Sequence, residues 1–383
     1  MGSDFKIHFN IPPVIGREVE YIRDAISSHK ICGDGKYTRL CSDWLEKRYM
    51  ANKVLLTTSG SAALDMAALL CDIGEGDEVI LPSYTFSSTA NAFALRGAKL
   101  VFVDIRPDTM NIDEELIREA ITDKTKVIVV VHYAGVACEM DEIMEIAKSN
   151  NILVVEDAAQ AVESKYKNIP LGTIGDFGCF SFHETKNFSM GEGGAILINN
   201  KKHEKLAEIY REKGTNRSAF FRGEVSKYNW VDYGDSFLQS DLNAAYLWAQ
   251  LCEVDSIQSN RMETWKLYRK TFEECQERYN FELQCIPDYC IHNAHMFYIK
   301  LQNKELRDAY IEYMRSKGIL CVFHYVPLHS APAGIKFGRF FGEDKYTTQE
   351  SEKLVRLPLY YGMTIMQKEL VIDNTIKFFE RTL

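Results

Sequence analysis

The chain has 383 residues, enough for about two to three domains, and its 45 basic and 54 acidic side chains give a net charge of −9. With 46% hydrophobic and 26% charged residues, it has the composition of a globular protein rather than a disordered one. The acidic excess argues against partners such as nucleic acid or a membrane surface, since both require a basic face. A small anionic ligand is not excluded, because it needs only a few local donors.

The ten cysteines show neither Cys-x-x-Cys nor zinc-finger spacing. They are typical of buried thiols in a reducing compartment, and we expect no metal site. The longest apolar runs are far shorter than the roughly 18 residues of a membrane helix. The N-terminus has no basic stretch leading into an apolar core. We therefore expect a cytoplasmic enzyme.

From residue 53 to about 200, short apolar runs alternate with helical patterns. Strands that are apolar throughout and separated by helices indicate a parallel sheet covered on both faces. The expected strands are residues 53–57, 78–82, 99–104, 126–132, 152–156, 178–183 and 195–199. The expected helices between them are residues 61–71, 87–96, 113–121 and 141–149.

The pattern changes near residue 255, after a long helix expected over residues 240–257. In the later part, the pattern predicts three helices, over residues 262–279, 305–317 and 367–381. It also predicts two strands, over residues 296–301 and 320–326. We therefore predict an α/β fold with a large, mostly parallel sheet domain (residues 1–255) and a smaller C-terminal α+β domain (residues 256–383).

Polar residues follow several of the expected strands, and in open parallel sheets ligands bind beyond the carboxyl ends of the strands. These residues are 58–61, 83–86, 132–133, and Asp157 with Gln160. We expect them to converge at one edge of the sheet. Gly60 stands at a strand-to-helix turn, where backbone N–H groups can approach an anion, although an ordinary helix N-cap has the same pattern.

Asp157 follows an apolar strand, so it either caps the next helix or pairs with a cation held in the same crevice. A protonated pyridine nitrogen would be such a cation. Lys186 stands in a turn before the glycine-rich residues 191–194, where a lysine is usually solvated. Each signal is weak by itself. Their order along the chain is more specific: a glycine turn, an aromatic residue, Asp, then Ser with Lys.

That order resembles pyridoxal phosphate (PLP) enzymes of the aspartate aminotransferase-like fold (PLP fold type I), and more narrowly the sugar-nucleotide aminotransferases of the DegT/StrS type. The resemblance covers nearly the whole chain. The motifs that carry it are residues 82–86, 131–140, 181–187, 213–218 and 322–329. Their wording, above all His-Glu-Thr-Lys-Asn at 183–187, is similar to that of members that aminate C4 of a dTDP-linked sugar.

The resemblance implies roles for four residues around the PLP ring. Lys186 would bond the cofactor covalently and later carry a proton between substrate carbon and cofactor, which requires a lowered pKa. Asp157 would pair with the ring nitrogen, and Gln160 would hydrogen-bond the phenolate oxygen. Phe86 would stack on the ring.

The resemblance also implies phosphate and substrate contacts. Gly60, Ser61 and Ser181 would hold the cofactor phosphate. Asn243 would reach the phosphate of the partner subunit's cofactor, so a homodimer with shared active sites is expected. The candidates for the sugar or diphosphate end, each of which could equally be structural, are His324, Tyr325, His329 and Arg217.

The implied reaction takes an amino group from L-glutamate, which leaves as 2-oxoglutarate. It places that group on a dTDP-4-keto-6-deoxyhexose, giving dTDP-4-amino-4,6-dideoxy-D-galactose for a surface polysaccharide of the enterobacterial common antigen or O-antigen type. The gluco epimer and a 3-aminotransferase stay open as alternatives. A keto-sugar dehydratase of the family would carry His in place of Lys186. A non-catalytic regulatory binding protein would not need the intact set of Lys186, Asp157 and Ser181.

Overall fold

A large eight-stranded sheet, with strand order β1-β9-β8-β5-β4-β2-β3-β14, forms the centre of the computed structural model, which describes residues 5–382. Only β9 is antiparallel to its neighbours β1 and β8, and the other pairs of this sheet are parallel. The strands are β1 (Lys53–Thr57), β2 (Glu78–Pro82), β3 (Lys99–Val103), β4 (Thr125–Val131), β5 (Leu153–Asp157), β8 (Phe177–Ser181), β9 (Gly194–Ile198) and β14 (Gly338–Phe340).

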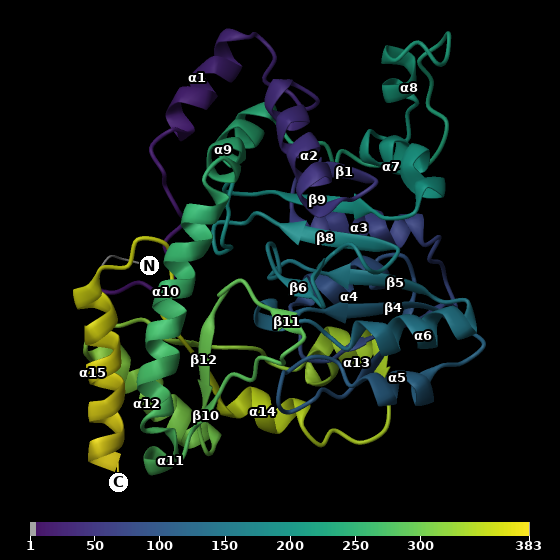
Figure 1. Cartoon of the computed structure of the whole chain (residues 1–383). Coiled ribbons are helices and arrows are strands. Elements are labelled where there is room, and N and C mark those ends of the chain that lie inside the picture. The colour runs from purple at the N-terminus through teal and green to yellow at the C-terminus, as the bar shows by residue number, and fades with distance from the viewer. Residues whose placement is uncertain (1–4, 383) are drawn as a thin grey trace.

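Helices cover both faces of this sheet (Figure 1), as expected for strands that are apolar along their whole length. Successive side chains of a strand point to opposite faces. Val127 and Val129 of β4 therefore join one hydrophobic core, whereas Ile128 and Val130 join the other. The helices on the large sheet are α1 (Glu18–Ser27), α2 (Lys36–Tyr49), α3 (Gly60–Leu70), α4 (Ser87–Ala94), α5 (Glu114–Ala120), α6 (Met140–Asn150), α7 (Glu204–Arg211) and α9 (Asp241–Leu251).

The strands and helices predicted between residues 53 and 200 are confirmed, with ends that differ by one or two residues. The single helix predicted over residues 240–257 is wrong. Helix α9 ends at Leu251, and a second helix, α10 (Val254–Glu273), begins after a short break. The apolar side of α9 packs on the core of the large sheet, whereas α10 buries Trp265 and Phe272 in a separate core. Val254 and Ile257 at the start of α10 still join the core of the large sheet, so α10 leads from one core to the other.

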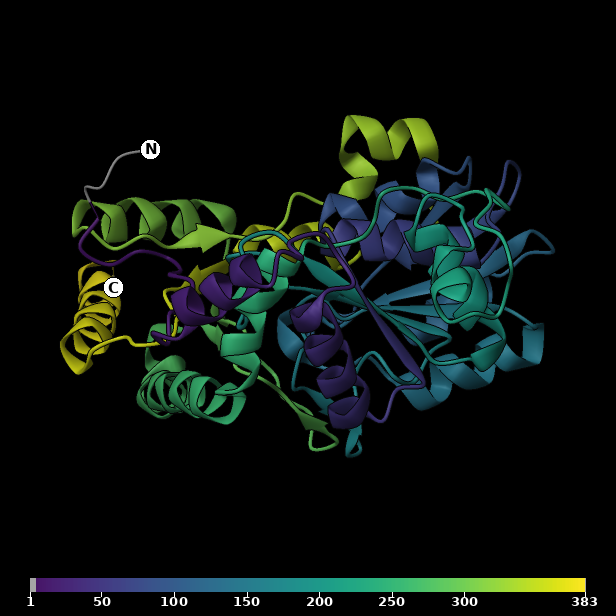
Figure 2. The same cartoon turned by 90° about the horizontal axis from the view of Figure 1, so that it is seen from above.

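The C-terminal part contains an antiparallel sheet with the strand order β10-β12-β15-β13. Its core unites α10 with α12 and α15, and Figure 2 shows these helices at one end of the molecule with the large sheet at the other. Strand β14 also comes from this part of the chain, yet it pairs with β3 at the edge of the large sheet. The elements are β10 (Glu282–Leu283), β12 (Phe297–Lys300), α12 (Lys304–Ser316), β13 (Val322–Phe323), β15 (Leu354–Leu357) and α15 (Ile365–Thr382).

Shorter elements complete the chain, and a small sheet of β11, β6 and β7 ties the two parts together. No helix within residues 5–382 is long and apolar enough to cross a membrane. The remaining elements are β6 (Lys165–Tyr166), β7 (Ile169–Pro170), α8 (Arg217–Phe221), α11 (Gln276–Tyr279), β11 (Cys290–Ile291), α13 (Pro332–Phe337), α14 (Thr347–Lys353), and the 3₁₀ turns η1 (Tyr133–Gly135), η2 (Lys201–His203) and η3 (Leu328–Ser330).

A buried carboxylate fixes the carboxyl end of β5. Glu156 has no exposed surface and accepts backbone N–H groups from Gly172, Ile174 and Gly175, each at 2.7 Å. Its second oxygen also lies 2.9 Å from Nε2 of the buried His132. These bonds satisfy the charge in the interior. They also anchor the loop beside the strand end that carries Asp157.

Replacing Glu156 with Ala leaves three buried N–H groups and one imidazole nitrogen without partners. We expect Glu156→Ala to lower the free energy of unfolding by about 3 kcal/mol or more, measured by urea unfolding. The matched control is Glu119→Ala on the exposed side of α5, which should change stability little. Equal effects of the two substitutions would contradict the role assigned to this carboxylate.

Candidate active site

A cavity of about 460 Å³ lies at the carboxyl ends of the parallel strands, where the sequence predicts a ligand site. Residues that follow β1, β2, β5 and β8 line it together with residues from the C-terminal part. The lining includes the predicted residues Gly60, Ser61, Phe86, Asp157, Gln160, Ser181, Lys186, His324 and Tyr325. The structure thus brings together distant parts of the chain, since Gly60 and Tyr325 are 265 positions apart in the sequence.

One end of the cavity is an anion-binding cradle at the N-terminus of α3. Ser59 caps the helix, with its Oγ accepting the N–H of Ala62 at 3.0 Å, and Ser61 Oγ lies 2.6 Å from Ser88 Oγ. A Cβ atom at Gly60 would lie 2.8 Å from Cβ of Ser181, so only glycine allows β8 to approach this closely. Hydroxyls and free helix N–H groups with the favourable dipole suit a phosphate.

Lys186 stands in the turn after β8, where its backbone N–H bonds the carbonyl of His183 at 2.9 Å. Its side chain reaches the cavity. Burial lowers the pKa of Lys186 to about 8, while Asp157 acts in the opposite direction and Arg356 adds to the lowering. At pH 7 roughly a tenth of such an amine is neutral, far more than for an ordinary lysine, and the neutral amine is the nucleophilic form.

Asp157 ends β5 and is 6% exposed. Its Oδ1 accepts the N–H of Ala159 at 3.1 Å, but residues 158–164 form turns rather than a helix, so the helix-cap alternative for Asp157 is wrong. Its Oδ2 accepts the hydroxyl of the buried Thr89 at 2.6 Å. One oxygen of Asp157 therefore serves this turn, and the carboxylate also lines the cavity, where its pairing with a cation stays a prediction. Thr89 is a positioning residue that the sequence analysis missed.

One side of the cavity presents two aromatic rings and an amide, from Phe86, Tyr325 and Gln160. Gln160 accepts the N–H of Ala134 at 2.7 Å and donates to the Tyr325 hydroxyl at 3.1 Å. Burial raises the pKa of Tyr325 to about 12, so its hydroxyl stays protonated. Phe86 is 59% exposed at the cavity, whereas the nearby Tyr84 is fully buried. The exposed ring is the one that a ligand can stack on.

Several cavity residues were missed by the sequence analysis, and Arg356 and His295 are the two cationic or titratable ones from the C-terminal part. Arg356 lies on β15 and His295 precedes β12, and both line the cavity. His295 Nδ1 lies 2.9 Å from Oδ1 of Asn187, the neighbour of Lys186. Arg356 interrupts the apolar run Leu-Val-Arg-Leu, and a charge inside an apolar strand is the signal that could have found it.

Two other predicted residues lie away from this cavity. His329 Nδ1 lies 2.7 Å from Ser83 Oγ, and its Nε2 lies 3.3 Å from Asp344, so its ring joins η3 to β2. Arg217 pairs with Glu212 at 3.0 Å and lines a different hollow beside α2 and α7. Neither residue is among those that line the cavity with Lys186, and a substrate role for them stays a prediction.

Asn243, on the first turn of α9, points its amide at the rim of the cavity. It donates to the carbonyl oxygen of Glu192 at 3.2 Å, and Glu192 itself lines the cavity. The side chain of Asn243 is otherwise held by Ser240, the cap of α9. Its contact with a partner subunit's cofactor stays a prediction.

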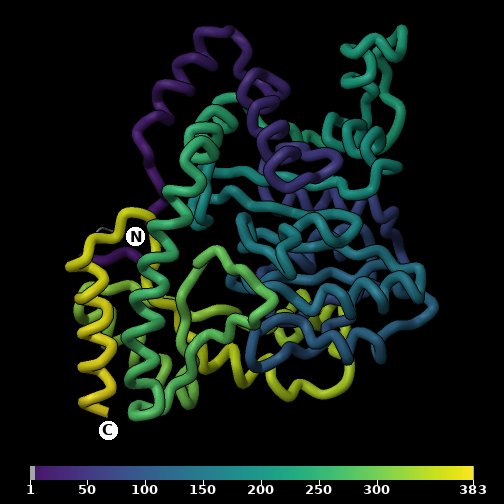
Figure 3. Tube along the Cα trace, in the orientation of Figure 1, coloured from purple at the N-terminus to yellow at the C-terminus, as the bar shows by residue number. Residues whose placement is uncertain are grey.

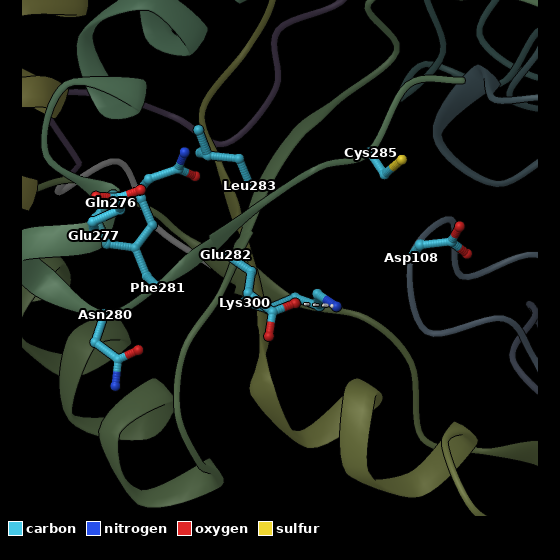
Figure 4. Close-up of a pocket in the computed structure, with 9 residues that line it drawn as sticks. All are labelled: Asp108, Gln276, Glu277, Asn280, Phe281, Glu282, Leu283, Cys285 and Lys300. Atoms are coloured by element: carbon cyan, nitrogen blue, oxygen red, sulfur yellow. Dashed lines mark ion pairs between the residues drawn. The ribbon is translucent and has the colours of Figure 1, made fainter. Parts of the chain in front are cut away.

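A second hollow, near β10, offers no comparable chemistry (Figure 4). Its only lysine, Lys300, already pairs with Glu282 at 2.7 Å and with Glu350 at 2.6 Å. Gln276 and Asp108 lie at opposite sides of the view in Figure 4. No cluster of His, Cys, Asp and Glu among residues 5–382 could hold a metal ion.

The groups in the main cavity fit PLP. The cradle at α3 suits its phosphate, Asp157 suits a protonated ring nitrogen, and Lys186 supplies an amine of lowered pKa. Phe86 offers an aromatic face and Gln160 an amide. The glycine at position 60 keeps the cradle open, because any side chain there would collide with Ser181.

Comparison with known sequences supports this fit. Residues 14–375 match the DegT/DnrJ/EryC1/StrS aminotransferase family. An uncharacterised protein of Methanocaldococcus jannaschii is 33% identical over 362 residues, which is 92% of each chain. GDP-perosamine synthase of Escherichia coli O157:H7 is 31% identical over 325 residues, covering 84% of this chain and 85% of that protein.

Comparison with solved structures confirms the predicted fold class. A protein of Streptococcus pneumoniae described as a sugar aminotransferase matches in its PLP form with a TM-score of 0.90 and 25% identity, over 98% of this chain and 99% of that one. Its PMP form matches with a TM-score of 0.91 and 25% identity, over 99% of this chain and 100% of that one. The aminotransferase TlmJ of Streptoalloteichus hindustanus, 24% identical, has the same fold with a TM-score of 0.90 over 98% and 99% of the two chains.

The lowered pKa of Lys186 predicts how fast the cofactor-free protein takes up PLP at different pH values. The amine is neutral above its pKa, so the rate should rise through about pH 8 and level off above it. Asp157 raises the pKa of Lys186, so Asp157→Asn should move the midpoint of this profile to lower pH. The measurement is the absorbance of the bound cofactor against time at saturating PLP.

The control for this profile is Glu192→Gln, which changes another carboxylate of the cavity wall that does not contribute to the pKa of Lys186. Its midpoint should equal that of the unaltered protein. A midpoint for Asp157→Asn that is unchanged or higher would contradict the assigned coupling.

Proposed function

The chain belongs to the DegT/DnrJ/EryC1/StrS aminotransferase family and uses PLP to transfer an amino group to a sugar, and we propose that this sugar is dTDP-4-keto-6-deoxy-D-glucose. L-Glutamate gives its amino group to the cofactor and leaves as 2-oxoglutarate. The keto sugar takes up that group at C4 and becomes dTDP-4-amino-4,6-dideoxy-D-galactose. The product serves a surface polysaccharide of the enterobacterial common antigen or O-antigen type, and the reaction takes place in the cytoplasm.

The observation that carries this proposal is that the side chains of Lys186 and Asp157 line the same cavity. Lys186 can take a proton from the carbon that bears the donor's amine and return one to the sugar carbon, because its pKa of about 8 permits both states. A dehydratase of the family would carry His at this position. A regulatory protein would have no need of the complete set of cofactor contacts.

The other cavity residues bind and orient. When bound, PLP supplies the electron sink that lets a substrate carbon lose and regain a proton. Asp157 would hold the charge on the ring nitrogen that makes this sink effective, and Thr89 fixes the carboxylate. Phe86 would stack on the ring, and Gln160, whose amide donates to the Tyr325 hydroxyl, would hydrogen-bond the phenolate oxygen of the ring.

The choice of a dTDP-linked 4-keto sugar is supported by the motifs at residues 183–187 and 322–329 and by the position of the second motif. His324 and Tyr325 of that motif line the cavity next to Lys186, where the sugar ring must lie. GDP-perosamine synthase, which is 31% identical to this chain, is named for a GDP-linked sugar. The dTDP-linked and GDP-linked substrates therefore have to be compared directly.

The purified enzyme should convert dTDP-4-keto-6-deoxy-D-glucose and L-glutamate into the galacto-configured amine. The proton NMR spectrum of the product reports the configuration, because an axial amine leaves H4 equatorial with small couplings to its neighbours. Large couplings, which mean an equatorial amine, would contradict the galacto assignment, and an amine at C3 would contradict the position. The matching GDP-linked keto sugar, tested in parallel, should react with a lower kcat/KM.

A homodimer is part of the same proposal. Residues 212–237 form an arm that projects from the large sheet with helix α8 at its end (Figures 1 and 3). Three large side chains of this arm are 70% or more exposed: Phe221, Trp230 and Tyr233. Clustered exposed aromatic groups are typical of a protein interface. A second copy over this arm and over the open side of Phe86 would close the cavity, and sedimentation at micromolar concentration should show a dimer.

A further inference from the structure

His295 is a buried histidine whose main chain is held in one place. It precedes β12, is 5% exposed and lines the cavity with Lys186. Its backbone N–H donates to Oδ1 of Asn293 at 3.0 Å, and its carbonyl oxygen accepts Nη2–H of Arg261 at 2.7 Å. Arg261 and Asn293 are both 1% exposed. The segment that carries the imidazole is therefore fixed from two sides by buried groups.

The hydrogen bonds of Asn187 decide which nitrogen of this imidazole carries the hydrogen. Nδ2 of Asn187 donates to the carbonyl oxygen of Asn293 at 2.8 Å, so Oδ1 of the same amide is the atom left for the histidine. Nδ1 of His295 lies 2.9 Å from that Oδ1. An amide oxygen can only accept, so Nδ1 is the donor. In the neutral ring Nε2 then carries no hydrogen and keeps a free lone pair.

The ring is neutral, and its free nitrogen has no partner in the chain. Burial holds the pKa of His295 well below its usual value, and nearby cationic side chains, above all Lys186, act in the same direction. Within residues 5–382 nothing donates a hydrogen bond to Nε2, and this atom is not fully enclosed by protein. The cavity wall therefore contains a hydrogen-bond acceptor whose orientation and tautomer are both fixed.

A neutral acceptor selects among the groups that can enter this cavity. The carboxylates of an amino-acid donor offer only lone pairs near neutral pH, so they cannot donate to Nε2. The hydroxyl groups of a sugar can donate. Asn187 directly follows Lys186, so His295 is bonded to the turn that presents the reacting amine. The hydroxyl that fits best is therefore the one closest to the reacting carbon of the sugar.

We propose that Nε2 of His295 binds the hydroxyl group on the sugar carbon next to the reacting carbon. The inference rests on the proposed function, in which C4 reacts and the neighbouring hydroxyl is on C3. Asn187 is a positioning residue, because it acts only by setting the tautomer of His295. The hydrogen bond forms in the sugar half of the reaction alone, so His295 distinguishes the acceptor sugar from the amino donor.

The test compares dTDP-4-keto-6-deoxy-D-glucose with its 3-deoxy analogue, which lacks this hydroxyl. Enzyme loaded with pyridoxamine phosphate is mixed with each sugar, and the cofactor absorbance is followed. The unaltered enzyme should prefer the hydroxylated sugar about 10-fold or more, because the analogue leaves a buried acceptor unpaired. In His295→Asn this preference should disappear. The amide nitrogen of Asn can replace Nδ1 toward Asn187, whereas nothing replaces Nε2.

A second readout needs no turnover. In protein labelled with nitrogen-15 at histidine, the nitrogen NMR shifts report which ring nitrogen carries the hydrogen. The signals of His295, identified by their absence from His295→Asn, should show the hydrogen on Nδ1. The unreactive ligand dTDP-6-deoxy-D-glucose should change the shift of Nε2 on binding, and its 3-deoxy analogue should not.

Two controls separate this role from general damage to the site. His292→Asn changes another buried histidine of the same segment, which does not line the cavity, and it should leave the preference for the hydroxyl unchanged. The donor half-reaction with L-glutamate should also be unchanged in His295→Asn. If Nε2 accepted a hydrogen bond from Lys186 instead, this half-reaction would slow as well, because it uses the same amine.

A preference for the hydroxylated sugar that persists in His295→Asn would overturn the inference, as would a hydrogen on Nε2. If His295→Asn fails to fold, His295→Ser, which lacks the ring altogether, is compared in the same way. The GDP-linked pair of sugars is measured in parallel, so an incorrect nucleotide leaves the test intact. An enzyme that takes the amino group of glutamate but passes it to no 4-keto sugar would refute the proposed function together with the inference. A persistent preference in His295→Asn would refute the inference alone.

Discussion

Opposing electrostatic effects on one amine govern the active site. Burial and Arg356 lower the pKa of Lys186, and Asp157 raises it. Too high a pKa would leave the amine protonated and unable to attack or to accept a proton, and too low a pKa would make it a weak base. The value of about 8 lies between these limits. The rest of the structure serves to keep the three charged groups in one cavity.

The sheet places two of the three groups. Strands β5 and β8 are parallel neighbours, so Asp157 at the end of one and Lys186 just beyond the other must lie on the same edge. Glu156 ties that edge to the adjacent loop. The third group comes from the C-terminal sheet, where β13 pairs with β15 and brings His324 next to Arg356. The cavity therefore exists only where the two parts of the chain meet.

The large sheet could be predicted because its strands are apolar on both faces and helices separate them, a pattern that few other folds produce. The break between α9 and α10 could not, since apolar residues continue across it and the residues on both sides of it pack in the same core. Strand β14 has three residues and pairs through its backbone, which leaves no mark in the sequence.

In the site, too, some residues could be predicted from the sequence pattern, whereas others depend on how the folded chain packs. Lys186 and Asp157 could be predicted because their order along the chain matches the family's motifs, and Asp157 also because it stands at the end of an apolar strand. Arg356 could not be assigned without knowing which face of β15 meets the cavity. His329 and Arg217 belong to motifs of the family resemblance, but a motif does not report where a side chain points, and in this chain both are held by other partners.

Borohydride reduction of the PLP-loaded enzyme, followed by peptide mass spectrometry, tests the central role of Lys186 most directly. Reduction makes the bond between cofactor and protein permanent, so the modified peptide identifies the amine that holds PLP. The account predicts a single phosphopyridoxyl group on Lys186. A label on another lysine, or a protein that takes up no cofactor, would contradict it.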